Sequence, residues 1–170
     1  MIATVHHSSV DVYYASITDY TSYASLPQLS FEGATKKNRP VLVQGNLVYA
    51  RVSLANKHMD PELECVSQST GKSDGLGLLT GGMLFNISLG MARRLMMPKP
   101  VEQGKLVVLD ELGEAGVAFE IAVGRNGKVW VDSKNPKTTL AVGKAIQDTD
   151  DKGLTMDEQK KLVKKLVREL

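Results

Sequence analysis

The chain has 170 residues, 42% hydrophobic and 24% charged, a composition that excludes a disordered or fibrous protein and suffices for one large or two small domains. Its formal net charge of +2 excludes a global basic field, so any contact with nucleic acid must depend on local patches. The single cysteine excludes an internal disulfide framework, and no apolar run reaches the ~20 residues that span a bilayer.

Short strand-like segments separated by turns fill the first 80 residues. The predicted strands lie within residues 1–18, where there are two runs, and within residues 20–31, 47–54 and 61–66. Five short strands with Gly, Pro and Asn turn signals favour an OB-type β-barrel. His6 and His7 fall between the first two runs, and we expect them in a solvated turn because no third metal ligand is near.

Helical and strand patterns alternate in the rest of the chain. We predict a strand over residues 81–89, a helix from Ser88 through Met97, a short helix over residues 104–112 that ends at Gly113, a hairpin over residues 120–131, a helix that begins at Asn135 and Pro136, and a final helix with a Thr155–Glu158 capping box. Residues 1–80 carry 6 basic and 7 acidic side chains, and residues 81–170 carry 15 and 12. Neither part has the charge of a strong polyanion binder.

The segment EIAVGRNGKVWV, residues 120–131, admits two interpretations. An Asn-Gly pair between strand-forming runs is typical of a β-hairpin, because both residues tolerate positive φ. A Gly-x-x-Gly loop is also the RNA clamp of a KH domain, but that clamp joins two helices, whereas KVWV favours a strand. We therefore favour a structural role for Gly124, Asn126, Gly127 and Trp130, and we expect the loop to be buried between two domains.

Several segments together resemble a known family. IATV, VDVYYASI, LPQLSF and VLVQGNLVYARV resemble an S1 domain, the RNA-binding form of the OB fold. FEGATKKNRP followed by GRNGKVWV is similar to the S1/KH cap subunits of the eukaryotic RNA exosome, in particular the subunit with a GxNG loop. The resemblance covers essentially the whole chain. It implies an α+β fold, with an OB-type S1 β-barrel at residues 1–79 and a KH-like α/β domain at residues 80–170.

The resemblance also implies a function. Such a subunit is non-catalytic, stabilises the exosome ring and guides RNA 3′ ends to a nuclease on another chain, for processing and decay of ribosomal RNA precursors, structured RNAs and messenger RNA. Its partners are single-stranded RNA and the other ring and cap subunits, in the nucleus, nucleolus and cytoplasm. No DNA, membrane or cofactor is expected. Members carry a further N-terminal domain, so we expect the sequence to be truncated at its start.

The alternative is an autonomous S1/KH protein that binds single-stranded RNA by itself. An RNA-processing enzyme is a third class, but no catalytic or metal site is predicted. Asp110, Glu111 and Glu114 are a close acidic cluster without a histidine, nucleophile or metal-ligand spacing beside it. We expect Cys65 to be a small buried hydrophobe, because no His–Asn or His–Asp partner set is visible.

The predicted RNA contacts are Tyr14, Lys36, Lys37, Arg39 and Arg51. The S1 pattern has two aromatic residues on the second strand and a histidine on the third. Tyr14 matches the second aromatic, whereas Asp11 and Ser25 stand at the other two positions, which weakens the case for base stacking. Tyr13, Tyr20 and Tyr23 are other aromatics that would compensate or pack in the sheet. The basic loop is either solvated or a phosphate contact, which would give affinity and salt dependence without sequence readout.

Overall fold

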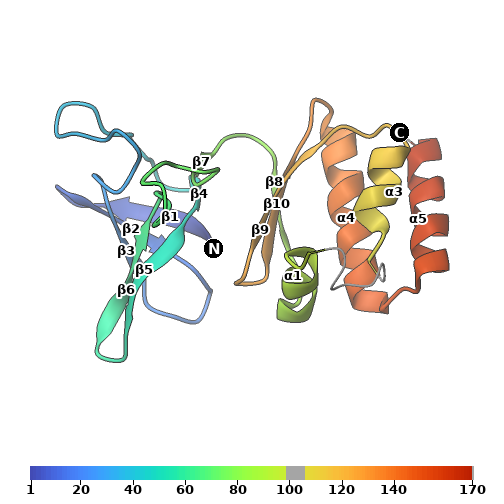
Figure 1. Ribbon diagram of the computed structural model, residues 1–170, viewed down its shortest axis with the longest axis horizontal. Coiled ribbons are helices and arrows are strands. Elements are labelled where there is room, and N and C mark those ends of the chain that lie inside the picture. Colours follow the sequence, from blue (N-terminus) through green and yellow to red (C-terminus); the bar gives the residue numbers. More distant parts are fainter. Residues whose placement is uncertain (99–105, 170) are drawn as a thin grey trace. The chain divides into compact units, whose positions relative to one another are not determined.

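The computed structural model describes residues 1–98 and 106–169. The chain forms two compact units, Met1–Thr80 and Gly81–Leu170, each with its own hydrophobic core (Figure 1). The first unit is all β, and the second combines one sheet with helices. This arrangement confirms the predicted α+β class.

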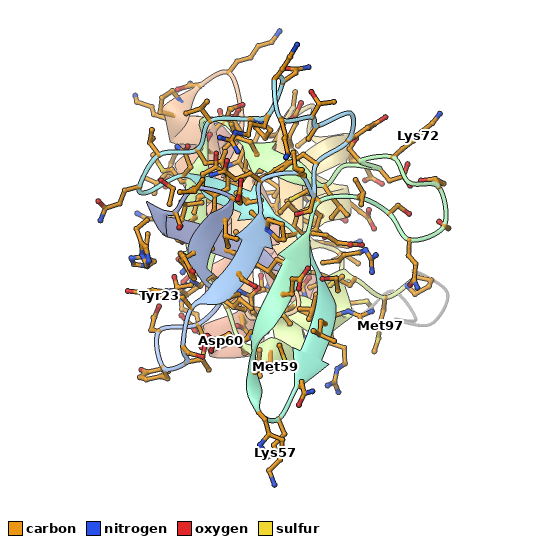
Figure 2. All side chains as sticks on the ribbon, turned by 90° about the vertical axis from the view of Figure 1, so that its left-hand side faces the viewer. Tyr23, Lys57, Met59, Asp60, Lys72 and Met97 are labelled. Atoms are coloured by element: carbon orange, nitrogen blue, oxygen red, sulfur yellow. The ribbon has the colours of Figure 1, made fainter. Side chains whose placement is uncertain are left out.

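The strands of the first unit, called here the S1 unit, are β1 (Ile2–Ser8), β2 (Val12–Ser16), β3 (Ala24–Pro27), β4 (Leu47–Tyr49), β5 (Arg51–Asn56), β6 (Met59–Glu64) and β7 (Gly77–Leu79). Their order in the sheet is β5-β6-β3-β2-β1-β4-β7. All pairs are antiparallel except β3 with β6, which run parallel with Ser25 opposite Glu62. Figure 2 shows the β5–β6 hairpin projecting from the unit with Lys57 at its tip.

The sheet closes on itself through β4 and β5. These two strands are consecutive in the chain and are separated only by Ala50, yet β4 pairs with β1 while β5 pairs with β6. Ala50 is fully buried, and its backbone N–H donates to the carbonyl oxygen of Met1 at 2.9 Å. A single run of chain therefore joins both sides of the curled sheet, which is how an OB-type barrel is closed.

Alternation along the strands fills the barrel. One face of each strand is apolar and buried, so the side chains of β1, β2, β3, β4 and β6 meet in one cluster. Its fully buried members include Ala3, Ala15, Leu26, Val48 and Leu63. The opposite faces are half-buried or exposed, and they are where the side chains of the candidate site lie.

One prediction for this unit is wrong. His6 and His7 lie in strand β1 and not in a turn, because β1 continues to Ser8. The turn comes later, where the Ser9 N–H donates to the Val12 carbonyl at 2.8 Å. The polar sequence of residues 6–9 suggested a turn, but pairing of His7 with Tyr14 on β2 keeps the backbone extended.

The second unit, called here the KH unit, contains β8 (Met83–Asn86), α1 (Leu89–Leu95), α3 (Val108–Glu114), β9 (Glu120–Gly124), β10 (Lys128–Asp132), α4 (Pro136–Lys152) and α5 (Met156–Glu169). Its antiparallel sheet has the order β8-β10-β9. Helix α4 packs on β8 and β10, and α3 and α5 pack on α4 and on each other (Figure 1).

The predicted helix starts in the KH unit are confirmed by their caps. Ser88 accepts a hydrogen bond from the Met91 N–H at 3.0 Å, Asn135 accepts one from the Lys137 N–H at 3.1 Å, and the Glu158 carboxylate accepts from the Thr155 N–H at 2.8 Å. The helix predicted over residues 104–112 begins outside the described residues. Among the described residues the helix α3 begins only at Val108, since Leu106 and Val107 are not helical, and it runs one residue beyond Gly113, so both predicted ends are shifted. A left-handed turn at Gly116 follows it.

Close packing between α4 and the sheet depends on a glycine. A Cβ atom at Gly143 would lie 2.1 Å from the ring of Phe85 in β8, so only glycine lets that ring touch the helix. The ring belongs to a core that also contains Val129, Val131 and Ile146. None of the helices in the described ranges is long and apolar enough to cross a bilayer.

Candidate nucleic-acid interface

Four aromatic rings gather on the outer face of the S1 barrel, namely those of His6, His7, Tyr14 and Tyr23, which we call the ring cluster. His7 on β1 lies opposite Tyr14 on β2, and their rings stack with centroids 4.6 Å apart and an interplanar angle of 16°. Tyr23, just before β3, contacts His7 edge-on at 5.6 Å and His6 at 4.8 Å. Figure 2 shows Tyr23 on the surface of the unit.

A β-bulge brings both histidines into the cluster. The register passes from Val5 opposite Ala15 directly to His7 opposite Tyr14, so His6 is an extra residue in β1. In a regular strand His6 and His7 would point to opposite faces, whereas the bulge re-aims the chain so that both reach Tyr23. The His6 Nε2 also lies 3.1 Å from the Ser16 Oγ, which fixes the ring.

The ring cluster places a histidine beside Tyr14 although Ser25 stands at the histidine position of the S1 pattern. Ser25 lies directly opposite Tyr14 on β3, where the pattern has a histidine. The histidine next to Tyr14 stands instead on the other neighbouring strand, at His7 of β1. Tyr14 is half-buried and Tyr23 is 42% exposed, so their ring faces remain partly open to a stacking base.

Tyr13 and Tyr20, the other two tyrosines that could replace the missing S1 aromatic, lie outside the ring cluster. Tyr13 points into the barrel at 3% exposure, and its hydroxyl donates to the Pro40 carbonyl at 2.6 Å and accepts from the Leu42 N–H at 3.2 Å. Tyr20 is 97% exposed and makes no ring contact among the described residues. Tyr13 is therefore a structural anchor, and Tyr20 lies outside the ring cluster.

The basic loop with Lys36 and Lys37 is a tight, anchored turn. Thr35 and Asn38 exchange backbone hydrogen bonds of 2.9 and 3.0 Å, and this places the two lysines at the exposed tip. Within the described residues neither ammonium group makes a hydrogen bond or ion pair. The contact of Tyr13 with Pro40 anchors the far end of the loop to β2, the strand that carries Tyr14.

The two predicted arginine contacts are held within the S1 unit. Arg39 lies 3.5 Å from the Asp11 carboxylate and donates to the Val10 carbonyl at 3.3 Å, so it fastens the basic loop to the β1–β2 turn. Arg51 pairs with Glu64 across β5 and β6 and donates to the Val66 carbonyl at 2.8 Å. Both guanidinium groups have polar partners within the unit. Arg51 is less free than Arg39 to turn toward an RNA strand, because it is bound both to Glu64 and to the Val66 carbonyl.

The GRNG segment of the KH unit is the turn of the β9–β10 hairpin, which confirms the predicted hairpin. Gly124 pairs with Lys128, so three residues form the turn, and only Gly127 among them has a positive φ, whereas the prediction relied on positive φ at both Asn126 and Gly127. Gly127 has φ +74°, and a Cβ atom there would lie 2.7 Å from the Ile87 carbonyl oxygen. Its own N–H and carbonyl are used internally, by Gly124 at 3.2 Å and by the Ile87 N–H at 2.9 Å. Trp130 is 6% exposed, and its indole N–H donates to the Gly81 carbonyl at 2.9 Å.

Comparison of the sequence with known protein families identifies the type of S1 domain in the first unit. Residues 1–77 match the S1 domain of exosome complex component RRP40, and residues 82–137 match the KH domain family. Residues 1–77 therefore form an S1 domain of the RRP40 type, and a KH domain follows it.

Relatives named exosome complex component RRP40 align with most of this chain. Identity is 45% with the Schizosaccharomyces pombe protein, covering 86% of this chain and 58% of that one, and 36% with the Homo sapiens protein, covering 84% and 49%. The Saccharomyces cerevisiae protein is 38% identical, covering 81% and 55%. The chain therefore spans about half the length of these relatives.

A solved structure described as an exosome complex RNA-binding protein has the same fold as this chain. Its TM-score is 0.71, and the alignment covers 99% of this chain and 91% of that one at 22% identity. Each unit of the chain thus has a counterpart of known fold, an S1 domain followed by a KH domain.

Sequence reasoning missed the two histidines of this RRP40-type S1 domain. The pairing of β1 with β2 was predictable, and a register with His7 opposite Tyr14 would have shown the stacked pair. The bulge at His6 and the approach of Tyr23 had no signal in the sequence, because the bulge depends on the register of β1 against β2 and the approach of Tyr23 on how β3 lies beside β2. Cys65 is buried as expected, and burial raises the pKa of its thiol to about 12.

Proposed function

We propose that this chain is a non-catalytic, RNA-binding subunit of an RNA exosome, with its RNA surface on the S1 barrel. The observation that carries the proposal is the ring cluster, in a domain of the RRP40 type whose basic loop is anchored to β2. The proposal also includes contact with ring and cap subunits, which hold the chain where RNA 3′ ends pass to a nuclease on another chain. Nuclear, nucleolar and cytoplasmic locations follow from that role.

The arrangement suits a single strand of any sequence. Bases stack on the faces of Tyr14, His7 and Tyr23, and each stacked base contributes about 1–3 kcal/mol. Lys36 and Lys37 meet phosphates and add a salt-dependent term. None of these contacts reads a base edge, so affinity changes little with sequence. Arg39 contributes chiefly by holding the basic loop against the β1–β2 turn, and Arg51 chiefly by holding β5 to β6.

A non-catalytic role agrees with the chemistry of the described residues. Among them, no three His, Cys, Asp or Glu side chains gather as ligands of a metal ion. In the acidic cluster, Glu111 is bound to Lys160 at 3.3 Å. The thiol of Cys65, with its pKa of about 12, is protonated at neutral pH and is a poor nucleophile. The proposal places hydrolysis on another chain.

Autonomous RNA binding is the second candidate, because His7 and Tyr23 add stacking faces beside Tyr14, although Asp11 and Ser25 depart from the S1 pattern. The two functions differ in the affinity of the isolated chain. A scaffold whose RNA surface is completed by neighbouring subunits binds weakly alone, with dissociation constants of tens of micromolar or more, whereas an autonomous binder reaches about micromolar or better.

A fluorescence-anisotropy titration with labelled oligouridylate at two salt concentrations tests the RNA surface. Tyr14→Ala should weaken binding about 5- to 140-fold, the equivalent of one stacked base. Binding weakens as salt rises, so the logarithm of the association constant falls with the logarithm of the salt concentration. Changing Lys36 and Lys37 to Glu should make this slope less steep by about 1.4, the value for two lost phosphate contacts on a single strand. The matched controls are Tyr20→Ala, an exposed ring outside the cluster, and Lys57→Glu at the β5–β6 tip.

Each outcome of this titration has a meaning. Losses confined to the Tyr14 and lysine variants support the S1 surface. If Tyr20→Ala and Lys57→Glu weaken binding as much as the site variants do, the RNA surface is not where we place it. Membership of an exosome is tested separately by mixing the chain with purified ring and cap subunits and measuring co-elution.

A further inference from the structure

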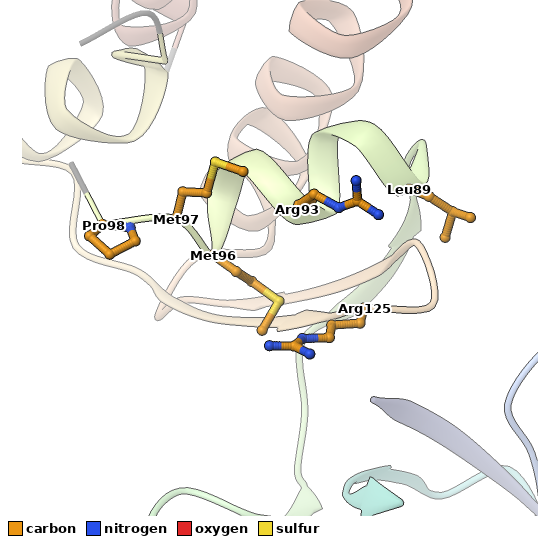
Figure 3. Close-up of a pocket in the computed structure, with 6 residues that line it drawn as sticks. All are labelled: Leu89, Arg93, Met96, Met97, Pro98 and Arg125. Carbon is orange, nitrogen blue, oxygen red and sulfur yellow. The ribbon is translucent and has the colours of Figure 1, made fainter. Parts of the chain in front are cut away.

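A concavity of about 410 Å³ lies in the KH unit between α1 and the turn of the β9–β10 hairpin. We call it the α1 groove, and it is lined by Leu89, Arg93, Met96, Met97, Pro98 and Arg125. Figure 3 shows the Arg125 side chain running beneath α1 toward Met96. The groove is separate from the ring cluster, which belongs to the other unit.

Two guanidinium groups border the α1 groove without partners. Arg93 and Arg125 are both exposed, and within residues 1–98 and 106–169 neither makes a hydrogen bond or an ion pair. A guanidinium offers five donors in a planar fork and binds a carboxylate or a phosphate through two parallel hydrogen bonds. Two such groups at one groove therefore favour an anionic ligand.

The rest of the lining is aliphatic and unusually exposed. Leu89, Met96 and Met97 are 63%, 41% and 37% exposed, although apolar side chains of this size are usually covered. Methionine and arginine are enriched in protein–protein interfaces, and methionine adapts to irregular apolar partners. The combination fits a ligand that carries both carboxylates and aliphatic side chains.

RNA fits the α1 groove less well. Single-stranded RNA is held by aromatic rings on which bases stack, and none of the described lining residues is aromatic. The glycine N–H that a KH clamp would offer to the backbone is already used, because Gly127 donates to Gly124 at 3.2 Å. The turn thus supplies one arginine side chain and no backbone cradle at Gly127.

We propose that the α1 groove binds an acidic, aliphatic-containing segment of a partner protein. Carboxylates of the segment pair with Arg93 and Arg125, and an aliphatic side chain lies against Leu89 and the two methionines. The inference does not depend on the RNA surface of the S1 unit, because no residue is shared between the two sites.

The test uses a random-peptide display library selected on the whole purified chain. Selected peptides are synthesised with a fluorescent label, and their affinity is measured by anisotropy for three forms of the chain. These are the unaltered chain, the double variant Arg93→Glu with Arg125→Glu, and the control Lys161→Glu with Lys164→Glu. The control changes charge equally on the exposed face of α5. A milder pair, Arg93→Gln with Arg125→Gln, is measured in case charge reversal disturbs folding, which circular dichroism reports.

We expect selected peptides to combine Asp or Glu with Leu, Ile or Val, and to bind the arginine variants about tenfold more weakly than the control. Peptides without acidic residues, or equal loss in the arginine and lysine variants, would overturn the proposal. The proposal would also be overturned if the library yields no peptide and the arginine variants lose oligouridylate binding, because the groove would then be an RNA site. RNA binding that depends on Tyr14 is measured on the same variants and should not change.

Discussion

Gln159 of α5 is expected to stabilise the KH unit by capping a different helix. Helix α3 begins at Val108, and its N-cap residue Val107 makes no side-chain cap hydrogen bond. The Gln159 Oε1 accepts hydrogen bonds from the N–H groups of Val107 at 2.9 Å and Val108 at 3.1 Å, and its Nε2 donates to the Leu154 carbonyl at 2.9 Å. The side chain is fully buried, so water cannot replace these bonds easily.

The change Gln159→Leu keeps the side-chain volume and removes all three of these hydrogen bonds. Leaving a buried donor unsatisfied costs about 1–3 kcal/mol, and the Val108 N–H is fully buried while the Val107 N–H is only partly so. The leucine recovers part of this cost through its own burial. We therefore expect the free energy of unfolding of the KH unit to fall by about 2–4 kcal/mol.

Urea unfolding followed by tryptophan fluorescence measures this loss. Trp130 is the single tryptophan of the chain and is buried in β10, so its emission reports the KH unit alone. The control is Gln147→Leu, which loses one exposed hydrogen bond, from its Nε2 to the Asn86 carbonyl at 2.9 Å, and should cost less than about 1 kcal/mol. If Gln159→Leu proves no more costly than Gln147→Leu, Gln159 does not act as the cap of α3.

Three further predictions concern single groups. Gly127→Ala should cost about 2–3 kcal/mol in the same unfolding assay, because its φ is +74° and a carbonyl oxygen lies 2.7 Å from the new Cβ, whereas Gly113→Ala meets no atom and should be near neutral. Cys65, whose thiol pKa burial raises to about 12, should resist Ellman's reagent at pH 8 until the S1 unit unfolds; rapid reaction of the folded chain would contradict this. Hydrogen bonds from Thr155 lower the pKa of Glu158, so the stability it contributes is present above pH 4.5 and disappears as pH falls. The deficit of Glu158→Gln should therefore shrink in urea titrations below that pH, and a constant deficit would exclude the carboxylate as its cause.

Features that depend on a few neighbouring residues were predictable from the sequence. The hairpin at residues 120–131 follows from an Asn-Gly turn between strand formers, and the caps at Ser88, Asn135 and Thr155 follow from side chains that bond to the backbone two or three residues away. The resemblance to S1/KH cap subunits rested on whole motifs, and it led to the correct domain types.

The tertiary structure alone decided which distant side chains meet. His6 joins Tyr23 only because of a bulge in β1, Gln159 reaches α3 only through the packing of α5, and Arg125 approaches α1 only because the hairpin folds against Ile87. Such contacts leave no short-range pattern, since they depend on sheet register and on how helices pack. The sequence by itself therefore determined the elements and their caps, while long-range packing determined the ring cluster and the α1 groove.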